Sequence, residues 1–540
     1  MKRPVLAFLA LVLLVLLAAQ KPALPEAPTG FLHVQGRAVL DGQGRTVLLR
    51  GINMDNFYYF YPDLPPAYGT RDDIRRLAGI GASVIRLGFH WSWFVNSDFG
   101  YDLIDRYLTW CEEFGVYVIL DLHVVPPDGD VGNNLIWDDP AAQQKFIDIW
   151  TALAARYRSR TIVAGYDLYN EPGPPQASQW WDLAGRAIAA IRAVDPDHIL
   201  VIEPPLTDPA TFQVVADPNV LYSPHDYEPF AVTHAGADWV GDSTVPGDYS
   251  YPGRVLTGVE WIGWSEGAAV LESKARTWRS WDSGLLTAIS GAEWATVKPF
   301  AWGRAGDVWF DDLELEQNGV SRTVWNAGAE EESRSRPGLP SDWFFYGEGN
   351  FKGSWGTQAH RGIHSLEVSG SDDSGYGIWA QDDWILTGPL FRVKPGDTLR
   401  VRGWLLAPDN AGGCGLGVDY LKGDYEDYDA RRMYQNLKPT LDWAAAHNVP
   451  LYYGEFGAMR HSPGYSGYYV LLDKIGMMNA LGLHWTLWSF RDTDPQGFGL
   501  YHGDYFEPAA AGVFDQPLSE ILGWGFQGFQ PFPLSSPKTR

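Results

Sequence analysis

Residues 164–172 read AGYDLYNEP, a short apolar run that ends in Asn170, Glu171 and Pro172. Amphipathic stretches flank it, one over 139–158 and one over 176–194, and both have the periodicity of a helix. Strands that are buried on both faces of a parallel sheet are apolar on both faces, as this run is. The segment therefore predicts a parallel strand between two helices, with polar side chains at its carboxyl end.

The same alternation continues on both sides of this segment. Further strands are predicted at 47–53, 82–89, 115–123, 198–204, 219–225, 449–457 and 483–490. Helices are predicted from Thr70 to Leu77 and over 101–114, 428–447 and 466–481, with Thr70 as a cap. Eight such units predict an α/β fold, a (β/α)8 TIM barrel. Residues 31–51 precede it and predict a hairpin with an Asp-Gly turn that closes the barrel bottom.

Residues 251–421 break this rhythm. They contain alternating runs such as DVWFDDLELE (307–316), many Gly and Trp residues, and little helical periodicity. This pattern predicts an antiparallel β-sandwich domain inserted between the sixth and seventh strands. The barrel is then divided into a first part over 31–250 and a second part over 422–540, which includes a C-terminal tail.

The chain begins with Lys2 and Arg3, followed by an apolar run to Ala19. We expect residues 1–19 to be a signal peptide or an uncleaved N-terminal anchor and residues 20–30 to be a linker, in a secreted or extracytoplasmic protein. The formal net charge of −25 argues against nucleic acid and anionic membranes as partners. Cys111 and Cys414 are expected to be free thiols, and we expect a monomer.

Eight polar or aromatic residues lie on or just after the predicted barrel strands: Arg86, His123, Asn170, Glu171, His225, Tyr227, Glu455 and Trp488. Taken singly, each has an ordinary explanation as a salt bridge, a loop cap or a core residue. Together they would converge on the carboxyl face of the barrel, where such enzymes have their active sites. Two carboxylates in that place suit glycoside hydrolysis, in which one protonates the leaving oxygen and the other attacks the anomeric carbon. No motif for a required metal or nucleotide cofactor is present.

The motifs YNEPG, SPHDYEP, YGEFG and TLWSF resemble those of glycoside hydrolase family five, the cellulase family of retaining TIM-barrel enzymes. The resemblance covers about 31–235 and 425–505, and all eight residues match the family pattern. It implies that Glu171 is the acid/base and Glu455 the nucleophile. It also implies that Asn170 contacts the sugar 2-hydroxyl, that Arg86 and Tyr227 orient Glu455, and that His225 supports Glu171. His123 would bind sugar hydroxyls, and Trp488 would form the floor of a subsite.

Parts of the insertion resemble the carbohydrate-binding modules of families four and nine. These are WNAGAEEE (325–332) with SDWFFYG (341–347), HRGIHSLEVSG (360–370), and the run from WATVKPF to DVWFDDLELEQNG (294–319). The closing strand comes first, so the module would be circularly permuted. The resemblance implies that Asp312 and Glu330 could hold a structural calcium ion. Five tryptophans are either sandwich core or glycan platforms, and the sequence leaves this open: Trp343, Trp355, Trp379, Trp384 and Trp404.

The leading hypothesis is a retaining endo-β-glycosidase that hydrolyses a β-linked polysaccharide, with β-1,4-glucan as the first choice. Mannanase, β-1,3-glucanase and glycolipid-cleaving activities stay open, because the eight residues are shared among them. A non-catalytic glycan-binding protein is the alternative from another class, although it would not need two carboxylates. Retention predicts a separation of about 5–5.5 Å between the two carboxyl groups.

Overall fold

The structure is a computed structural model that describes residues 30–54, 69–95, 97–127, 135–240, 245–267, 270–271, 275–333, 336, 338–381, 390–409, 412–503 and 512–528. The chain divides into two compact units. The barrel unit comprises Met1–Glu228, Asp429–Arg460 and Gly467–Arg540, and the sandwich unit comprises Pro229–Tyr428 and His461–Ser466. The predicted signal peptide or anchor and all of the linker except Gly30 lie outside the described residues and stay predictions.

The barrel unit contains the predicted ring of eight parallel strands. In chain order these are β3 (Arg50–Met54), β4 (Val84–His90), β5 (Tyr117–Val124), β6 (Val163–Asp167), β7 (Ile199–Ile202), β8 (Val220–Tyr222), β23 (Tyr452–Tyr453) and β24 (His484–Leu487). Parallel bridges from Tyr222 to Leu451 and from His225 to Glu455 join the sixth and seventh strands and complete the ring. The predicted TIM barrel is thus confirmed.

Helices follow most of the strands and cover the outside of the ring: α2 (Arg71–Ile80), α3 (Phe99–Phe114), α4 (Pro140–Tyr157), α5 (Ala177–Arg192), α7 (Ala430–His447), α8 (Ser466–Ala480) and α9 (Gln516–Phe526). The predicted cap at Thr70 is confirmed, because its side chain accepts from the backbone of Asp73 while Asp73 reaches back to Thr70. α9 lies in the segment that was predicted to be a C-terminal tail, because Pro517 and two glycines obscure the helical spacing of its buried positions Leu518, Leu522 and Phe526. Among the described residues, none of the helices has the length and apolar character that a bilayer span requires.

The hairpin before the barrel differs in its turn from the prediction. β1 (His33–Gln35) and β2 (Ala38–Leu40) pair around Gly36-Arg37, where Gly36 has a φ of 59°. The Asp41-Gly42 pair forms a second turn, in which Asp41 accepts from the backbone N–H groups of Gln43 and Arg45. Leu32 and Val39 of the hairpin region pack into one apolar cluster with residues near the amino ends of the barrel strands, including Val84. The hairpin therefore covers the barrel bottom, as expected.

The sandwich unit contains two seven-stranded antiparallel sheets. The first has the order β10-β22-β13-β19-β16, with β9 beside β22 and β20 beside β13, and the second has the order β11-β21-β14-β18-β17, with β12 beside β21 and β15 beside β14. The first sheet comprises β9 (Gly253–Glu266), β10 (Val270–Leu271), β13 (Trp294–Trp302), β16 (Phe344–Glu348), β19 (Tyr376–Ala380), β20 (Phe391–Arg392) and β22 (Gly413–Tyr428). The second comprises β11 (Ala275–Asp282), β12 (Leu286–Thr287), β14 (Gly306–Gln317), β15 (Val320–Arg322), β17 (Lys352–Gly356), β18 (Ser365–Gly370) and β21 (Thr398–Ala407).

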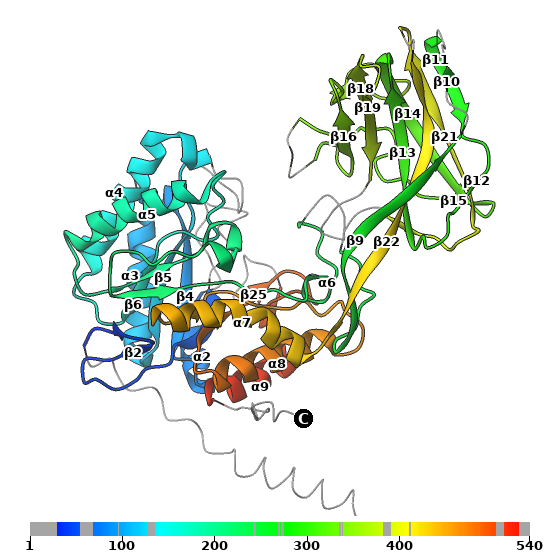
Figure 1. Cartoon of the computed structure of the whole chain (residues 1–540). Helices are drawn as coiled ribbons and strands as arrows, with labels where there is room; N and C mark the ends of the chain where they lie inside the picture. The colour runs from blue at the N-terminus through cyan, green and yellow to red at the C-terminus, as the bar shows by residue number, and fades with distance from the viewer. Residues whose placement is uncertain are drawn as a thin grey trace, which may run out of the picture. The chain divides into compact units, whose positions relative to one another are not determined.

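The unit extends beyond the predicted 251–421 on both sides. β9 and β22 form one long antiparallel pair (Figure 1), whose register runs out to Gly253 and Tyr428. Trp343 and Trp379 are completely buried between the sheets, so these two tryptophans are core rather than platform. Trp384 lies outside the described residues.

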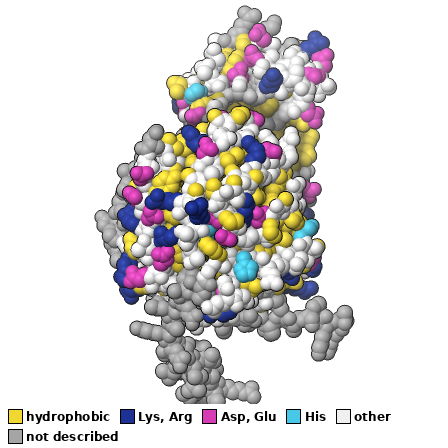
Figure 2. Space-filling model, turned by 90° about the vertical axis from the view of Figure 1, so that its left-hand side faces the viewer, with side chains coloured by type: hydrophobic (Ala, Val, Ile, Leu, Met, Phe, Trp, Pro, Cys, Tyr) yellow, Lys and Arg dark blue, Asp and Glu magenta, His cyan; other side chains and the backbone are white. Residues whose placement is uncertain are grey.

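Basic and acidic side chains are interspersed on the side of the barrel unit that Figure 2 presents. Ion pairs near the surface join α3 to α4 and to the segment after α4, for example Asp105 with Arg156 at 2.5 Å and Glu112 with Arg160 at 2.7 Å. Pairs of this kind contribute little to stability because water and salt screen them. Despite the overall negative charge, this face presents no large patch of one sign.

Candidate active site

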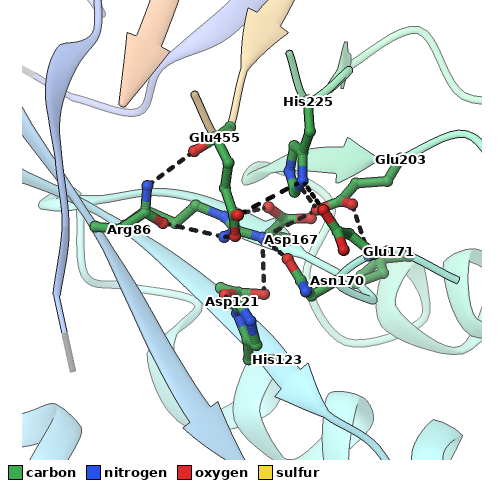
Figure 3. A network of polar contacts seen from close by, with 12 residues as sticks. Arg86, Asp121, His123, Asp167, Asn170, Glu171, Glu203, His225 and Glu455 are labelled. Atoms are coloured by element: carbon green, nitrogen blue, oxygen red, sulfur yellow. Dashed lines mark hydrogen bonds and ion pairs between the residues drawn. The ribbon is translucent and has the colours of Figure 1, made fainter. Parts of the chain in front are cut away.

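The Arg86 guanidinium is the centre of a buried polar network at the carboxyl end of the barrel (Figure 3). Its side chain is fully buried in β4. Its nitrogens lie 2.7 Å from Glu455 Oε1, 2.8 Å from Asp167 Oδ2, 2.9 Å from Asn170 Oδ1 and Glu203 Oε1, 3.0 Å from Asn53 Oδ1 and 3.1 Å from Asp121 Oδ1. A buried guanidinium needs such partners, because an unpaired buried charge is costly. Arg86 therefore links four barrel strands or the loops that follow them to the seventh strand.

Glu171 and Glu455 face each other within this network. One carboxylate oxygen of Glu171 lies within 4.8 Å of one of Glu455, and the His225 ring nitrogen lies within the same distance of both. Glu455 accepts from Arg86 on Oε1 and from the Tyr227 hydroxyl on Oε2, at 2.7 and 2.9 Å. Both oxygens of Glu455 are thus held, which fixes the orientation of its carboxylate.

The strand before Glu171 is shorter than the predicted 164–172. β6 ends at Asp167, and Glu171 follows it with a φ of 48°, a left-handed conformation that does not continue a strand. Such strained positions cluster at functional sites. The backbone N–H of Glu171 donates to Glu203 Oε2 at 2.7 Å, which holds this turn in place.

His225 lies among three carboxylates. Its Nδ1 is 2.7 Å from Glu171 Oε1 and 3.8 Å from Glu455 Oε2, and its Nε2 is 3.3 Å from Glu203 Oε1. Burial by itself would lower the pKa of His225, but the charges of Glu203 and Glu455 and the bond to Glu171 raise this pKa well above its ordinary value. The imidazole is therefore a cation that donates to Glu171 near neutral pH.

The proton on His225 affects the two glutamates differently. Burial would raise the pKa of Glu171, but the hydrogen bond and charge of His225 outweigh it and lower this pKa. Burial raises the pKa of Glu455, and the charges of His225 and Arg86 oppose that rise. The pKa values of the two glutamates are thus shifted in opposite directions, and His225 lies one hydrogen bond from Glu171.

His123 and Trp488 form a second part of the site. Their rings are stacked, with centroids 5.5 Å apart and an angle of 26° between the planes. His123 Nδ1 lies 2.7 Å from Asp121 Oδ2, and burial lowers the pKa of His123 to about 3. The imidazole is therefore neutral over the range in which proteins are stable. A neutral ring that Asp121 orients is suited to bind a sugar hydroxyl.

The structure brings all eight predicted residues into this region of the barrel and adds Asp121, Asp167 and Glu203, which were not predicted. Asp121 belongs to β5, Asp167 ends β6 and Glu203 follows β7. Burial raises the pKa of Asp121 to about 6, although Arg86 opposes that rise. An acidic residue inside an otherwise apolar strand was the signal available for these three.

Among the described residues, Glu171, His225 and Glu455 are the one group of three that could hold a metal ion. Arg86 and Tyr227 already occupy the oxygens of Glu455, which favours a role without metal. Asp312 and Glu330, the residues of the predicted calcium site, have other partners: Asp312 Oδ2 lies 2.6 Å from His360 Nδ1, and both oxygens of Glu330 accept from the backbone N–H of Ile363. These partners do not favour Ca²⁺ coordination by Asp312 and Glu330, and the calcium site stays a prediction.

Comparison with known proteins supplies independent evidence. Endoglucanase C of Acetivibrio thermocellus is 31% identical over 183 residues, 32% of this chain and 53% of that protein. A β-xylosidase of Phanerodontia chrysosporium is 29% identical over 263 residues, 39% of this chain and 54% of that protein. The chain thus spans about half the length of these curated relatives.

Among solved structures, an endoglucanase of Thermotoga maritima aligns over 88% of this chain and 96% of its own length, with 15% identity and a TM-score of 0.45. The family model named Cellulase, glycosyl hydrolase family 5, matches residues 40–331, more than half of the chain. The chain therefore belongs to glycosyl hydrolase family 5, the cellulase family.

Proposed function

We propose that this protein is a retaining endo-β-glycosidase in which Glu455 is the nucleophile and Glu171 the acid/base. The observation that carries the proposal is the pair of carboxylates at the ends of two barrel strands, with oxygens within 4.8 Å of each other. Retaining enzymes have carboxyl groups about 5–5.5 Å apart, whereas inverting enzymes leave room for a water molecule at about 6.5–9.5 Å. The short separation favours double displacement.

The roles of the two glutamates follow from their partners. Glu455 attacks the anomeric carbon, and the C–O bond to the leaving group breaks as a glycosyl ester forms. The Arg86 guanidinium and the Tyr227 hydroxyl orient Glu455 and stabilise its negative charge. Glu171 protonates the leaving oxygen and then accepts a proton from the water that cleaves the ester.

His225 supplies the proton of the first step. The charged imidazole donates to Glu171 Oε1 at 2.7 Å, so the proton can pass to Glu171 as the leaving oxygen gains negative charge. Glu203 favours the charged imidazole from the other side of the ring. Asn170, His123 and Trp488 bind the sugar: the first two by hydrogen bonds to hydroxyl groups, and the Trp488 ring by stacking on the C–H face of a pyranose.

For the substrate we propose a β-linked polysaccharide, with β-1,4-glucan first. The similarity to endoglucanase C and the family match support a glucan. Mannan, β-1,3-glucan and glycolipid substrates are the alternatives, because Arg86, Glu171 and Glu455 serve each of these reactions equally.

A reducing-sugar assay tests this proposal on soluble cellulose, glucomannan, xyloglucan, mixed-linkage glucan, xylan and laminarin. We expect release from at least one β-1,4-glucan, and no release by a Glu455→Ala variant prepared in parallel. Proton NMR of the first product gives the stereochemistry, and retention shows as an initial β-anomer. Initial formation of the α-anomer would refute double displacement, and inactivity on every polymer would refute a polysaccharide as the substrate.

We further propose that the chain is an exported monomer and that its sandwich is related to carbohydrate-binding modules. The apolar segment before Ala19 and the motif resemblance of residues 307–370 support these two statements. Size-exclusion chromatography with light scattering tests the oligomeric state, and we expect the molar mass of one chain.

A further inference from the structure

One face of the first sandwich sheet carries an aromatic cavity of about 530 Å³. Its wall includes five aromatic side chains that are all at least one-third exposed: Trp261, Trp264, Trp302, Tyr346 and Tyr376. Soluble proteins rarely expose this many large rings around one hollow unless something binds there. None of these residues is among the tryptophans that the sequence suggested as platforms.

A β-bulge places two of the rings side by side. Residues three apart in a regular strand point to opposite faces of the sheet. In β9, Trp261 pairs with Leu421 and Gly263 with Tyr420, so Ile262 is one extra residue, and Gly263 has a φ of 145°. Because of this bulge, Trp261 and Trp264 lie on the same face, with ring centroids 5.5 Å apart and planes 20° from parallel. Ile262 packs against the sandwich core instead.

The strand β22 has no side chains at three alternate positions on the face that carries Asp419. In β22, Cys414, Leu416 and Val418 belong to the sandwich core, so the alternate positions face the cavity side. Positions 413, 415 and 417 are all glycine. A Cβ atom at Gly413 would lie 2.4 Å from the Trp302 ring, so only glycine allows this ring to lie over the strand.

Two buried charged groups lie among the rings. Lys298 and Asp419 line the cavity and are 6% and 8% exposed. The Lys298 ammonium is 4.8 Å from the centre of the Trp264 ring and 3.4 Å from Asp419 Oδ1. Trp261 and Lys298 each contribute a side-chain hydrogen bond to Asp419. The two oxygens of a carboxylate can together accept about four hydrogen bonds, so Asp419 can still accept from a ligand hydroxyl.

We infer that this cavity is a binding site for a chain of neutral sugars, separate from the barrel site. Flat rings match the C–H faces of pyranoses, and Asp419, Lys298 and Glu266 match hydroxyl groups at the ring edges. Two carboxylates against one ammonium disfavour an anionic polymer. The inference rests on the proposed function only for its ligand class, a glycan, and not for catalysis.

The test uses the full-length chain with the Glu455→Ala substitution, so that the polymer is not consumed. Native gels containing hydroxyethylcellulose, glucomannan, xylan, laminarin or polygalacturonate measure retention. We expect retention on at least one neutral polymer. Trp261→Ala and Trp264→Ala should each weaken it roughly tenfold, because each removes a stacking surface. Asp419→Asn should weaken it as well, and polygalacturonate should retain nothing.

The matched control is Trp325→Ala, which removes a tryptophan that is equally exposed in the same unit but does not line the cavity. It should leave retention unchanged. Absence of retention on every neutral polymer would overturn the inference, and so would equal retention of the Trp261→Ala, Trp264→Ala and control variants. Binding of phosphatidylcholine vesicles, or a Trp264-dependent dimer in light scattering, in place of glycan retention would also overturn it.

A parallel assay separates this inference from the proposed function. Without the Glu455→Ala change, Trp261→Ala should hydrolyse a short aryl β-glycoside at the unmodified rate. Retention without any hydrolysis by the unmodified chain would reject the proposed function and leave the sandwich site standing. Hydrolysis without tryptophan-dependent retention would reject the sandwich site and leave the proposed function standing.

Discussion

The backbone N–H of Glu171 donates to Glu203 Oε2 at 2.7 Å, so a residue that follows the fifth barrel strand holds the turn after the fourth. The other oxygen of the same carboxylate accepts from Arg86 at 2.9 Å and lies 3.3 Å from His225 Nε2. Glu203 is 1% exposed, and three of its neighbours belong to the proposed catalytic machinery. It thus acts as a positioning residue that reaches the substrate only through others.

Replacement of Glu203 by Gln should lower kcat roughly 100-fold, in the range of a lost acid–base contribution, with little change in KM. Loss of its charge should also lower the pKa of His225, because Glu203 raises it. The basic limb of the pH–rate profile should therefore move to lower pH. Glu112→Gln, which changes an exposed carboxylate in an ion pair with Arg160, is the control. An unchanged pH profile would leave Glu203 a merely structural role.

Replacing Glu171 and replacing Glu455 should reduce activity in different ways. Glu455→Ala should abolish turnover of every substrate, because no ester can form. Glu171→Ala should lose roughly 10²–10⁴-fold on a natural glycan but much less on an aryl glycoside whose leaving group needs no proton. Steady-state kinetics with both substrate types measure this. Equal losses on both substrates in Glu171→Ala would contradict the acid/base role.

The buried His484 makes stability depend on pH. Its Nδ1 accepts from the backbone N–H of Leu49 at 3.0 Å, and burial lowers its pKa to about 4. Between pH 6.5 and 4 the unfolded chain binds a proton that the folded chain does not, so this contribution to stability is complete above pH 6.5 and is lost as pH falls. At 1.36 kcal/mol per pKa unit the loss is about 3 kcal/mol.

Chemical denaturation at pH 7 and pH 4.5 measures this effect. His484→Gln should reduce the difference in unfolding free energy between the two pH values, although the substitution also lowers stability at pH 7. His447→Gln, an exposed histidine in α7, should leave the difference unchanged. A pH dependence that is the same in all three proteins would show that His484 does not contribute.

Chelation should leave hydrolysis unchanged, because Arg86 and Tyr227 hold the oxygens of Glu455. An aryl β-glycoside assay with and without EDTA checks this. Activity that falls in EDTA and returns with a divalent cation would contradict it.

The predicted calcium site in the sandwich is tested by thermal unfolding. A melting temperature that falls in EGTA and recovers with Ca²⁺ would support the site, provided that the melting temperature of Asp312→Asn does not respond to either.

The sequence by itself determined the barrel, because strands buried on both faces must be apolar and the helices between them amphipathic. It also predicted the residues of the site, since parallel strands bring their carboxyl ends to one edge. Glu455 and Trp488 lie beyond the family match at 40–331, and they were predicted from the repeating strand pattern together with the resemblance of YGEFG and TLWSF to family motifs.

Only the tertiary structure decided which groups touch. The bridge between His225 and Glu455 closes the ring and brings the seventh strand to Arg86, a contact between distant residues that no local pattern encodes. Glu203 was one acidic residue inside the predicted strand 198–204, and only its burial and its contacts with Arg86 and His225 show that it belongs to this network. The pairing of Trp261 with Trp264 depends on a bulge, and a bulge exists only when two strands pair. Local periodicity specifies elements, whereas burial and partner choice arise when those elements pack together.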